Sequence, residues 1–284
     1  MSGSLIHRTV STVRAVRAVI ARPPYATPGH FYSPLTTNAD ISRCLDWPAA
    51  PGVDMREEEQ LALAARMAPL LAEPPSGPRY AAANGMYGPG DAAVFRALLA
   101  ELRPARLIEV GSGYSTAVAL DEADCNPDLS GLEITCIEPY PERLLGLLKV
   151  ADCDRITLLS QPVQELPMAT YEQLGPRDML FIDSTHVVKA GSDVVWLFLH
   201  VLPALAPGVI VHIHDVFWPF EYPDKWLQQH RDWTEAYLAH AFLLGNSAWN
   251  ILFFSSWFWH RHAGLVPGSL AQEEPGSIWI RKVG

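Results

Sequence analysis

Seven short apolar runs follow one another from residue 107 to the C-terminus, and amphipathic segments fill most of the earlier gaps between them. Runs of this kind are typical of strands that are buried on both faces. This alternation predicts an α/β fold with a doubly wound, largely parallel sheet and helices on both of its faces. We predict strands at 107–110, 134–138, 156–159, 179–183, 209–214, 250–254 and 277–281, and helices at 116–124, 141–150 and 188–203.

The first 90 residues have a different pattern. Residues 22–53 contain six prolines, which disfavour regular structure, and 57–72 have apolar residues at helical spacing. We predict an N-terminal arm over 1–90 that covers the active site, and a sheet domain over 91–284. Before the sixth strand, the aromatic segment 218–244 interrupts the alternation and is expected to form an insertion.

Helices are also predicted over 57–72 and, at the start of the sheet domain, over 92–102, with Asp91 as the N-cap of the latter. A further amphipathic helix is predicted over 10–21. Arg14 and Arg17 interrupt it, so we expect it to be neither a signal peptide nor a membrane-spanning segment. We expect it to pack on its own domain, with a partner subunit or a membrane surface as alternatives, and a homodimer is left open.

Composition narrows the class of protein. Hydrophobic residues make up 49% of the 284 residues, which indicates a packed core. The formal net charge of −10 argues against a nucleic-acid partner, because no excess of basic side chains is available to offset phosphates. Four cysteines without C-x-x-C spacing are typical of reduced thiols, so we expect a cytoplasmic protein.

The stretch 106–116 carries the clearest chemical signal. A buried strand runs into Gly111 and Gly113, and Ser115 or Thr116 can then cap the helix that follows. A strand, a glycine turn and a helix N-terminus together direct backbone N–H groups toward one point, which is typical of a nucleotide-type site. The turn lacks the Gly-Lys-Ser/Thr ending of a P-loop. Glu109, inside the strand, suits a cationic ammonium group better than a pyrophosphate.

The second strand ends in Glu138, followed by Pro139. Ligands of open α/β sheets lie beyond the carboxyl ends of the strands, near the switch point beside the first strand. A carboxylate at this place can accept hydrogen bonds from both hydroxyls of a ribose. We therefore predict that Glu138 recognises a ribose.

The pattern Glu-x-Gly-x-Gly at 109–113 resembles the first motif of the class I S-adenosylmethionine-dependent methyltransferases. This resemblance implies a Rossmann-like sheet of seven strands with the last strand antiparallel, an S-adenosylmethionine-binding domain over 91–284, and adenine contacts from the region after the third strand. The residues expected to contact the cofactor are Glu109, Gly111, Ser112, Gly113, Ser115, Glu138, Pro139, Gln161, Val163 and Asp183.

A second group of polar residues ends the fourth and fifth strands. Asp183 ends one strand, and His214 with Asp215 ends the other. Because both strand tips face the same edge of the sheet, these side chains can converge on a divalent metal ion. His214 and Asp215 can also serve as a metal-free acid–base pair. His212 lies about 7 Å deeper along the same strand face, so it is expected to be a core residue.

This arrangement resembles the metal-dependent O-methyltransferases of the catechol and macrolide-sugar types. In the catechol enzymes a basic residue three positions after the first acid is the general base, and His186 occupies that place. His214 departs from their pattern, which has a carboxylate there. An imidazole ligand shifts the preference from Mg²⁺ toward Mn²⁺, Fe²⁺ or Zn²⁺. We predict Asp183, His214 and Asp215 as metal ligands, and His186, His214 and Asp215 as catalytic residues, with His186 as base or as a further ligand.

The segments 181–193 and 212–223, together with Gly29-His-Phe-Tyr-Ser-Pro34, resemble a bacterial subgroup of the methyltransferase-24 type over about residues 25 to 283. In this fold, insertions near the tips of the fifth and sixth strands cover the acceptor. An aromatic-walled pocket is therefore expected, with a hydrophobic core or a dimer face as alternatives. The predicted pocket residues are His30, Tyr32, Tyr87, Trp218, Tyr222 and Trp257.

Together these features predict an enzyme that transfers a methyl group, with metal assistance, to a hydroxyl of a small metabolite such as a sugar or a natural-product intermediate. Three alternatives remain. The first keeps the cofactor and either changes the acceptor to nitrogen or cyclises the cofactor itself. The second is a non-haem Fe(II) oxygenase that uses His186, His214 and a carboxylate. The third is a binding protein that keeps the cofactor fold without turnover.

Overall fold

The structure is a computed structural model that describes residues 25–47, 52–73, 75–267 and 274–284. The helix expected over 10–21 lies outside the described residues. By packing, the chain divides into a smaller unit, Met1–Trp47 with Asp224–Asp232, and a larger unit, Pro48–Pro223 with Trp233–Gly284. The boundary expected after residue 90, between an arm over 1–90 and a sheet domain over 91–284, stays a prediction.

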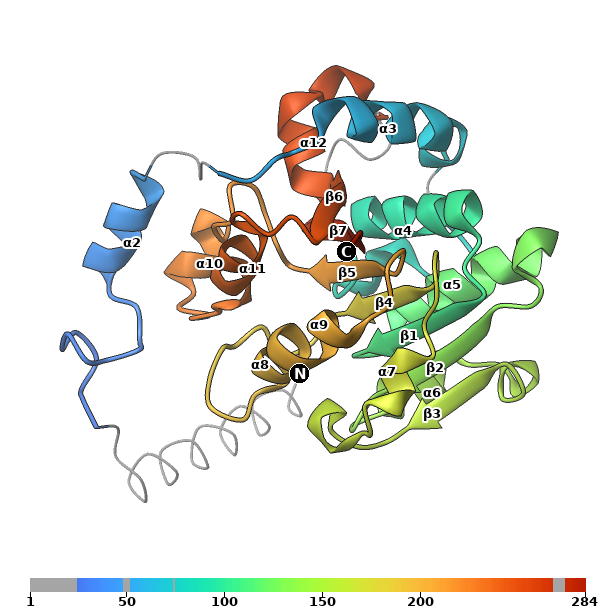
Figure 1. The fold of residues 1–284 in the computed structure, drawn as a ribbon, viewed down its shortest axis with the longest axis horizontal. Helices are drawn as coiled ribbons and strands as arrows, with labels where there is room; N and C mark the ends of the chain where they lie inside the picture. Colours follow the sequence, from blue (N-terminus) through green and yellow to red (C-terminus); the bar gives the residue numbers. More distant parts are fainter. Residues whose placement is uncertain (1–24, 48–51, 74, 268–273) are drawn as a thin grey trace, which may run out of the picture. The chain divides into compact units, whose positions relative to one another are not determined.

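A seven-stranded sheet forms the centre of the larger unit, in the order β3-β2-β1-β4-β5-β7-β6 (Figure 1). The five neighbouring strands β3, β2, β1, β4 and β5 run parallel, and β7 runs antiparallel to both β5 and β6. The Rossmann-like fold is confirmed, and every predicted strand is present with its ends within one residue. The strands are β1 (Arg106–Val110), β2 (Glu133–Ile137), β3 (Ile156–Leu159), β4 (Met179–Ile182), β5 (Ile210–His214), β6 (Trp249–Phe254) and β7 (Ser277–Lys282).

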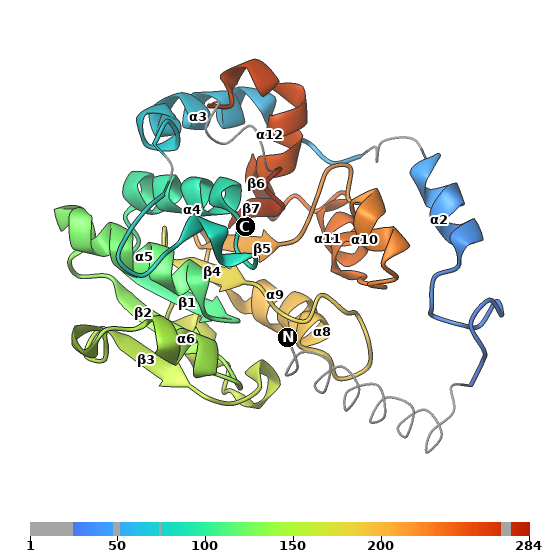
Figure 2. The same cartoon turned by 180° about the vertical axis from the view of Figure 1, so that it is seen from behind.

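Helices cover both faces of this sheet, which explains why all four residues of β4 are buried. Figures 1 and 2 show α4 and α5 on one face and α8 and α9 on the other. The α-helices of the larger unit are α3 (Glu57–Leu71), α4 (Pro89–Leu102), α5 (Tyr114–Cys125), α6 (Glu142–Leu147), α7 (Ala169–Glu172), α8 (Asp193–Trp196), α9 (Leu202–Ala204), α11 (Glu235–Leu243) and α12 (Ser255–Arg261).

Several helix predictions differ from the structure at their ends. The helix expected from residue 188 begins only at α8, because Ser192 is its N-cap and accepts a hydrogen bond from the N–H of Val195. The helix expected over 141–150 is the shorter α6. Asp91 is not an N-cap, since α4 begins two residues earlier, and the Asp91 carboxylate instead accepts hydrogen bonds from Gly276 N–H and Ser277 O–H.

The smaller unit contains α2 (Asn38–Leu45) and α10 (Asp224–Gln228). The expectation of irregular structure over 22–53 is wrong for α2. Thr37 and Asp40 form a reciprocal capping box that stabilises the start of this helix in a segment rich in proline.

An aromatic stack fills the sheet core directly beneath the carboxyl ends of β4 and β5. The ring of His212 lies 3.8 Å from that of Phe181 and 4.4 Å from that of Trp279. Burial holds the pKa of His212 well below its usual value, so this ring is neutral and packs as a core residue, as the alternation along β5 predicted.

A buried ion network lies near the C-terminal end of α5. The guanidinium of Arg79 donates hydrogen bonds to Asp121 at 2.7 Å, to Asp124 at 2.8 Å, and to both carboxylate oxygens of Asp152 at 2.6 and 2.8 Å. The backbone N–H groups of Arg79 and Tyr80 also donate to Asp121. Arg155 is a second cation of the network, 2.5 Å from Asp124. The network therefore anchors the segment before α4 to helix α5.

Candidate active site

The glycine turn after β1 brings three strand tips together. Gly111 has a φ of +80°, and a Cβ atom at this position would lie only 1.9 Å from the carbonyl oxygen of Asp183. Its N–H donates to the carbonyl of Ile137 in β2. Glycine is therefore required at position 111 so that the main chains of β1 and β4 can approach each other. Helix α5 then begins at Tyr114 with Gly113 as its N-cap, rather than at the expected caps Ser115 or Thr116.

Glu109 lies fully buried under this turn. Its carboxylate accepts a hydrogen bond from the hydroxyl of Thr116 and contacts Cys136 Sγ at 3.8 Å. Oε1 of Glu109 has no hydrogen-bond partner within the described part of the chain. Burial raises the pKa of Glu109 to about 7, although the bond from Thr116 opposes the shift. An orphaned buried acid is consistent with a positively charged ligand group at this turn.

Glu138 follows β2 at the same edge of the sheet. One carboxylate oxygen accepts the N–H of Ser112 at 3.2 Å, and the other accepts the N–H of Tyr140 at 2.8 Å. These two bonds fix the carboxylate beside the glycine turn, and each oxygen keeps a second lone pair. Glu138 is half-buried, and its recognition of a ribose stays a prediction.

The other predicted cofactor residues lie at different depths around this edge. Ser112 and Ser115 are buried, Pro139 is exposed and Gln161 is half-buried. Val163 is buried, and its carbonyl accepts the hydroxyl hydrogen bond of Tyr171. Their contacts with a cofactor stay predictions.

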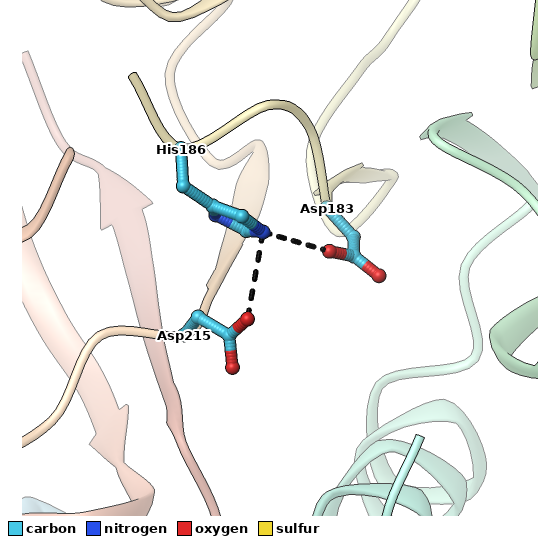
Figure 3. Close-up of side chains that lie close together, drawn as sticks. All are labelled: Asp183, His186 and Asp215. Atoms are coloured by element: carbon cyan, nitrogen blue, oxygen red, sulfur yellow. Dashed lines mark ion pairs between the residues drawn. The ribbon is translucent and has the colours of Figure 1, made fainter. Parts of the chain in front are cut away.

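The tips of β4 and β5 bring Asp183, His186 and Asp215 into one cluster (Figure 3). Nε2 of His186 lies 3.4 Å from Oδ1 of Asp183 and 3.4 Å from Oδ2 of Asp215. His186 is 6% exposed, whereas the Asp183 side chain is 34% exposed and can meet a ligand from solvent. These residues form the acidic edge of the site, next to the glycine turn.

His214 lies beside this cluster. Its Nε2 is 3.6 Å from Oδ1 of Asp215, and its ring is 5.3 Å from the ring of Tyr87. Burial alone lowers the pKa of an imidazole, but the carboxylates of Asp215 and Asp183 raise the pKa of His214. Of the two histidines predicted here, His186 faces both carboxylates, and His214 approaches the cluster through Asp215.

Glu235, the first residue of α11, is part of the site, and sequence reasoning missed it. Its Oε2 lies 2.8 Å from Nδ1 of His186, and the residue is 1% exposed. In the sequence, Thr234 and Glu235 precede an apolar helical segment, a pattern that predicts only the start of a helix. Nothing in that pattern indicates a partner 49 residues away.

Charges in the cluster are strongly coupled. Burial alone would lower the pKa of His186, but its contacts with Asp183 and Glu235 raise it to about 10. Burial raises the pKa of Asp215, although His214 opposes that shift. Partial desolvation opposes ionisation of Asp183, but His214 and His186 favour its ionised form and hold its pKa below the usual value. The site thus concentrates negative charge around an imidazole.

The residues present fit a divalent metal ion. One donor atom each from Asp183, His186 and Asp215 lies within 4.8 Å of the others. Two carboxylates and one imidazole are a donor set for Mn²⁺, Fe²⁺ or Zn²⁺, as well as Mg²⁺. Nε2 of His186 must lose its proton before it can act as a ligand, and the carboxylates then face one another without a positive charge between them.

The predicted pocket aromatics are distributed unevenly. Tyr87 is buried against His214. Tyr222 is buried and accepts the N–H of Ala236, and Trp257 is also buried. Trp218 is half-buried, and its backbone N–H donates to Ser256. The structure also reveals Trp233, whose ring lies 4.4 Å from that of His186.

His30 and Tyr32 belong to the smaller unit, where their rings lie 5.5 Å apart. A substrate-binding role for these two residues and for the other predicted pocket residues stays a prediction.

The decisive observation is that one recognised domain spans both halves of this site. Residues 108–216, from β1 to the tip of β5, match the family model described as "Methyltransferase domain". The chain belongs to the class I S-adenosylmethionine-dependent methyltransferases. This methyltransferase is 31% identical over 166 residues to an "Uncharacterized protein" from Archaeoglobus fulgidus, covering 52% of this chain and 72% of that protein.

Solved structures similar to this methyltransferase include two further methyltransferases. One is the O-methyltransferase TomG from Streptomyces achromogenes, with 15% identity, coverage of 82% of this chain and 92% of that chain, and a TM-score of 0.45. Another is PaMTH1 from Podospora anserina, with 16% identity, coverage of 88% and 98%, and a TM-score of 0.45.

Family membership leaves the Fe(II) oxygenase alternative without support, and the enzyme uses S-adenosylmethionine. Within the described residues, no helix of this methyltransferase is both long and apolar enough to cross a bilayer.

Proposed function

We propose that this enzyme transfers the methyl group of S-adenosylmethionine to a hydroxyl oxygen of a small metabolite, such as a sugar or a natural-product intermediate, with the help of a divalent metal ion. The setting proposed is the bacterial cytoplasm, consistent with four cysteines that are all free thiols. A nitrogen acceptor is the alternative within the same family.

The observation that carries this proposal is the convergence of Asp183, His186 and Asp215 at the edge that also bears the glycine turn and Glu138. Gly111 packs directly against the carbonyl of Asp183, so the cofactor turn and the acidic cluster share a backbone contact. A methyl donor held by the turn would therefore lie next to an acceptor held at the cluster.

A protonated hydroxyl is a poor nucleophile, and a bound divalent cation lowers its pKa and orients it. Asp183, Asp215 and Nε2 of His186 would hold that cation. The acceptor oxygen forms a bond to the methyl carbon as the carbon–sulfur bond breaks, and the sulfonium becomes a neutral thioether. Attack has to be in line with that bond, so positioning of both substrates contributes much of the rate.

The hydroxyl proton requires an acceptor close to the cluster. His214 is suited to this role, because Asp215 lies 3.6 Å from its Nε2 and raises its pKa. This proposal gives the metal-ligand role to His186, whereas the sequence favoured His214 as ligand and His186 as base or further ligand. The two histidines then differ in a measurable way.

The test is to follow formation of S-adenosylhomocysteine with a panel of phenols, sugars and hydroxylated natural products. We expect turnover that stops on removal of metal and returns with Mn²⁺ or Mg²⁺. His186→Gln should lose metal retention, whereas His214→Gln should keep the metal and lose turnover. Full activity of the metal-stripped enzyme would refute metal assistance, and failure to bind S-adenosylhomocysteine would refute the whole assignment.

A further inference from the structure

The buried carboxylate of Glu235 is placed to control the orientation of His186. Its Oε2 lies 2.8 Å from Nδ1 of His186, whereas its Oε1 has no hydrogen-bond partner in the part of the chain that the structure describes. Burial raises the pKa of Glu235, and the contact with His186 opposes that shift. Burial of a carboxylate is costly unless it is paired, so His186 is the partner that offsets this cost.

Glu235 does not perform the usual task of an acid at a helix start. Acids in the first turn commonly satisfy backbone N–H groups of their own helix. Among the residues that the structure describes, no side-chain hydrogen bond caps α11, and the Glu235 carboxylate is directed instead to the loop after β4. Its role therefore lies in its contact with His186.

The main chain around Glu235 also forms hydrogen bonds with His186. The carbonyl oxygen of His186 accepts the N–H groups of Thr234 at 2.9 Å and of Glu235 at 3.1 Å. Thr234 also accepts the N–H of Val188 through its hydroxyl at 2.7 Å. His186 has a φ of +60°, in the left-handed region that non-glycine residues seldom adopt. These bonds stabilise this backbone conformation and bring its ring toward the cluster.

With Nδ1 engaged, only Nε2 of His186 remains to face Asp183 and Asp215, each 3.4 Å away. We propose that Glu235 is the positioning residue of this site: it accepts a hydrogen bond from Nδ1–H of His186 and thereby presents Nε2 to the two aspartates. A histidine that binds a metal commonly donates its other ring N–H to a carboxylate, which orients the ring and raises its basicity. The inference rests on the proposed metal-assisted function.

The test uses the full chain labelled with ¹⁵N-histidine, in wild type and in the variants Glu235→Leu, Glu235→Gln and Asp178→Asn. Asp178 is a matched control, because it is a buried acid that accepts the N–H groups of Ala105 and Arg106 at the opposite ends of the strands. Comparison with His186→Gln assigns the His186 signals in the NMR spectra. The Mn²⁺ dissociation constant of each protein is measured alongside.

We expect a downfield, exchange-protected Nδ1–H proton of His186 in wild type and Asp178→Asn. Glu235→Gln should keep it through its amide oxygen, and Glu235→Leu should lose it, with Mn²⁺ binding weakened about 10- to 100-fold. An unchanged His186 spectrum in Glu235→Leu would overturn the inference. Failure of wild type to bind any divalent metal would refute the proposed function, whereas the Nδ1–H signal would still test the positioning role.

Discussion

Two clusters of buried charge in the same unit show how similar residues serve different ends. Around Arg79, three aspartates lie 2.6–2.8 Å from one guanidinium, so the chain itself supplies the central cation. Around His186, Asp183 and Asp215 lie 3.4 Å from an imidazole nitrogen that must be deprotonated before it can bind a metal. The guanidinium of the first cluster keeps its proton, whereas the imidazole of the second can release its proton and leave the two aspartates to a cation that comes from outside the chain.

This difference follows from where each cluster lies. Asp152 is fully buried, and Arg79 is nearly so, with 3% of its side chain exposed. At the carboxyl edge of the sheet, the Asp183 side chain is 34% exposed, beside the glycine turn of the cofactor site. Bidentate arginine pairing favours a fixed structure, whereas carboxylates open to solvent favour exchangeable ligands.

Removal of Asp183 should have the largest effect. We expect Asp183→Ala to lower turnover by about 10⁴-fold, or about 5 kcal/mol of transition-state stabilisation, because the metal ligand at the open face is lost. Elemental analysis should show loss of bound metal while the melting temperature stays near that of wild type. An Asp183→Ala variant with full activity would remove the distinction between the two clusters.

Replacement of Arg79 should lower the stability of the fold and leave ligand binding unchanged, which is the reverse of what we expect for Asp183→Ala. Arg79→Leu removes the central cation and leaves Arg155 paired with Asp124 at 2.5 Å. Breaking a buried ion network costs about 3–5 kcal/mol of unfolding free energy. Denaturant unfolding measures this loss. The folded fraction should bind S-adenosylhomocysteine and Mn²⁺ as wild type does. A variant with normal stability but impaired metal binding would show that the Arg79 cluster takes part in catalysis.

Replacement of Glu138 should affect cofactor binding and leave metal binding unchanged. Glu138→Ala should weaken S-adenosylhomocysteine binding by about 10- to 100-fold, since hydrogen bonds to a charged group contribute about 1.5–3 kcal/mol each. Isothermal calorimetry measures the affinity, and Mn²⁺ titration serves as the control. Equal affinity for the ligand in both proteins would contradict ribose recognition by Glu138.

The smallest effect that we expect is a change, at acidic pH, in the difference in unfolding free energy between wild type and Arg79→Leu. Hydrogen bonding by Arg79 holds the pKa of Asp152 below its usual value of about 4. The stabilisation that ionised Asp152 provides is therefore fully present above its pKa in the unfolded chain. This stabilisation is lost as the pH falls through the lower pKa that Asp152 has in the folded protein. The stability difference between wild type and Arg79→Leu should narrow in that pH range. A difference that stays constant with pH would contradict the pairing.

The sheet could be predicted because each strand is a short, continuous apolar run, which is the pattern of a strand buried on both faces. Glu138, Asp183 and Asp215 could be placed together from the sequence, since parallel strands end at one edge. Helix α2 was missed because local capping by Thr37 and Asp40 acts against the proline-rich composition of its segment. Local signals thus identified the elements and the edge of the sheet where the site lies.

The contacts of His186 depended on information that no local pattern carries. Its left-handed backbone and its bonds to Thr234 and Glu235 arise from tertiary packing of α11 against the loop after β4. The sequence therefore indicated which residue types meet, but it left open which of His186 and His214 faces the aspartates.

The central claim is that the Asp183–His186–Asp215 cluster binds a divalent ion beside the methyl donor. A crystal structure with S-adenosylhomocysteine and Mn²⁺, with anomalous scattering data, tests it most directly. We predict an anomalous peak within about 2.3 Å of one atom from each of the three residues, and a ribose at Glu138. An occupied cofactor site without an anomalous peak at the cluster would contradict the claim.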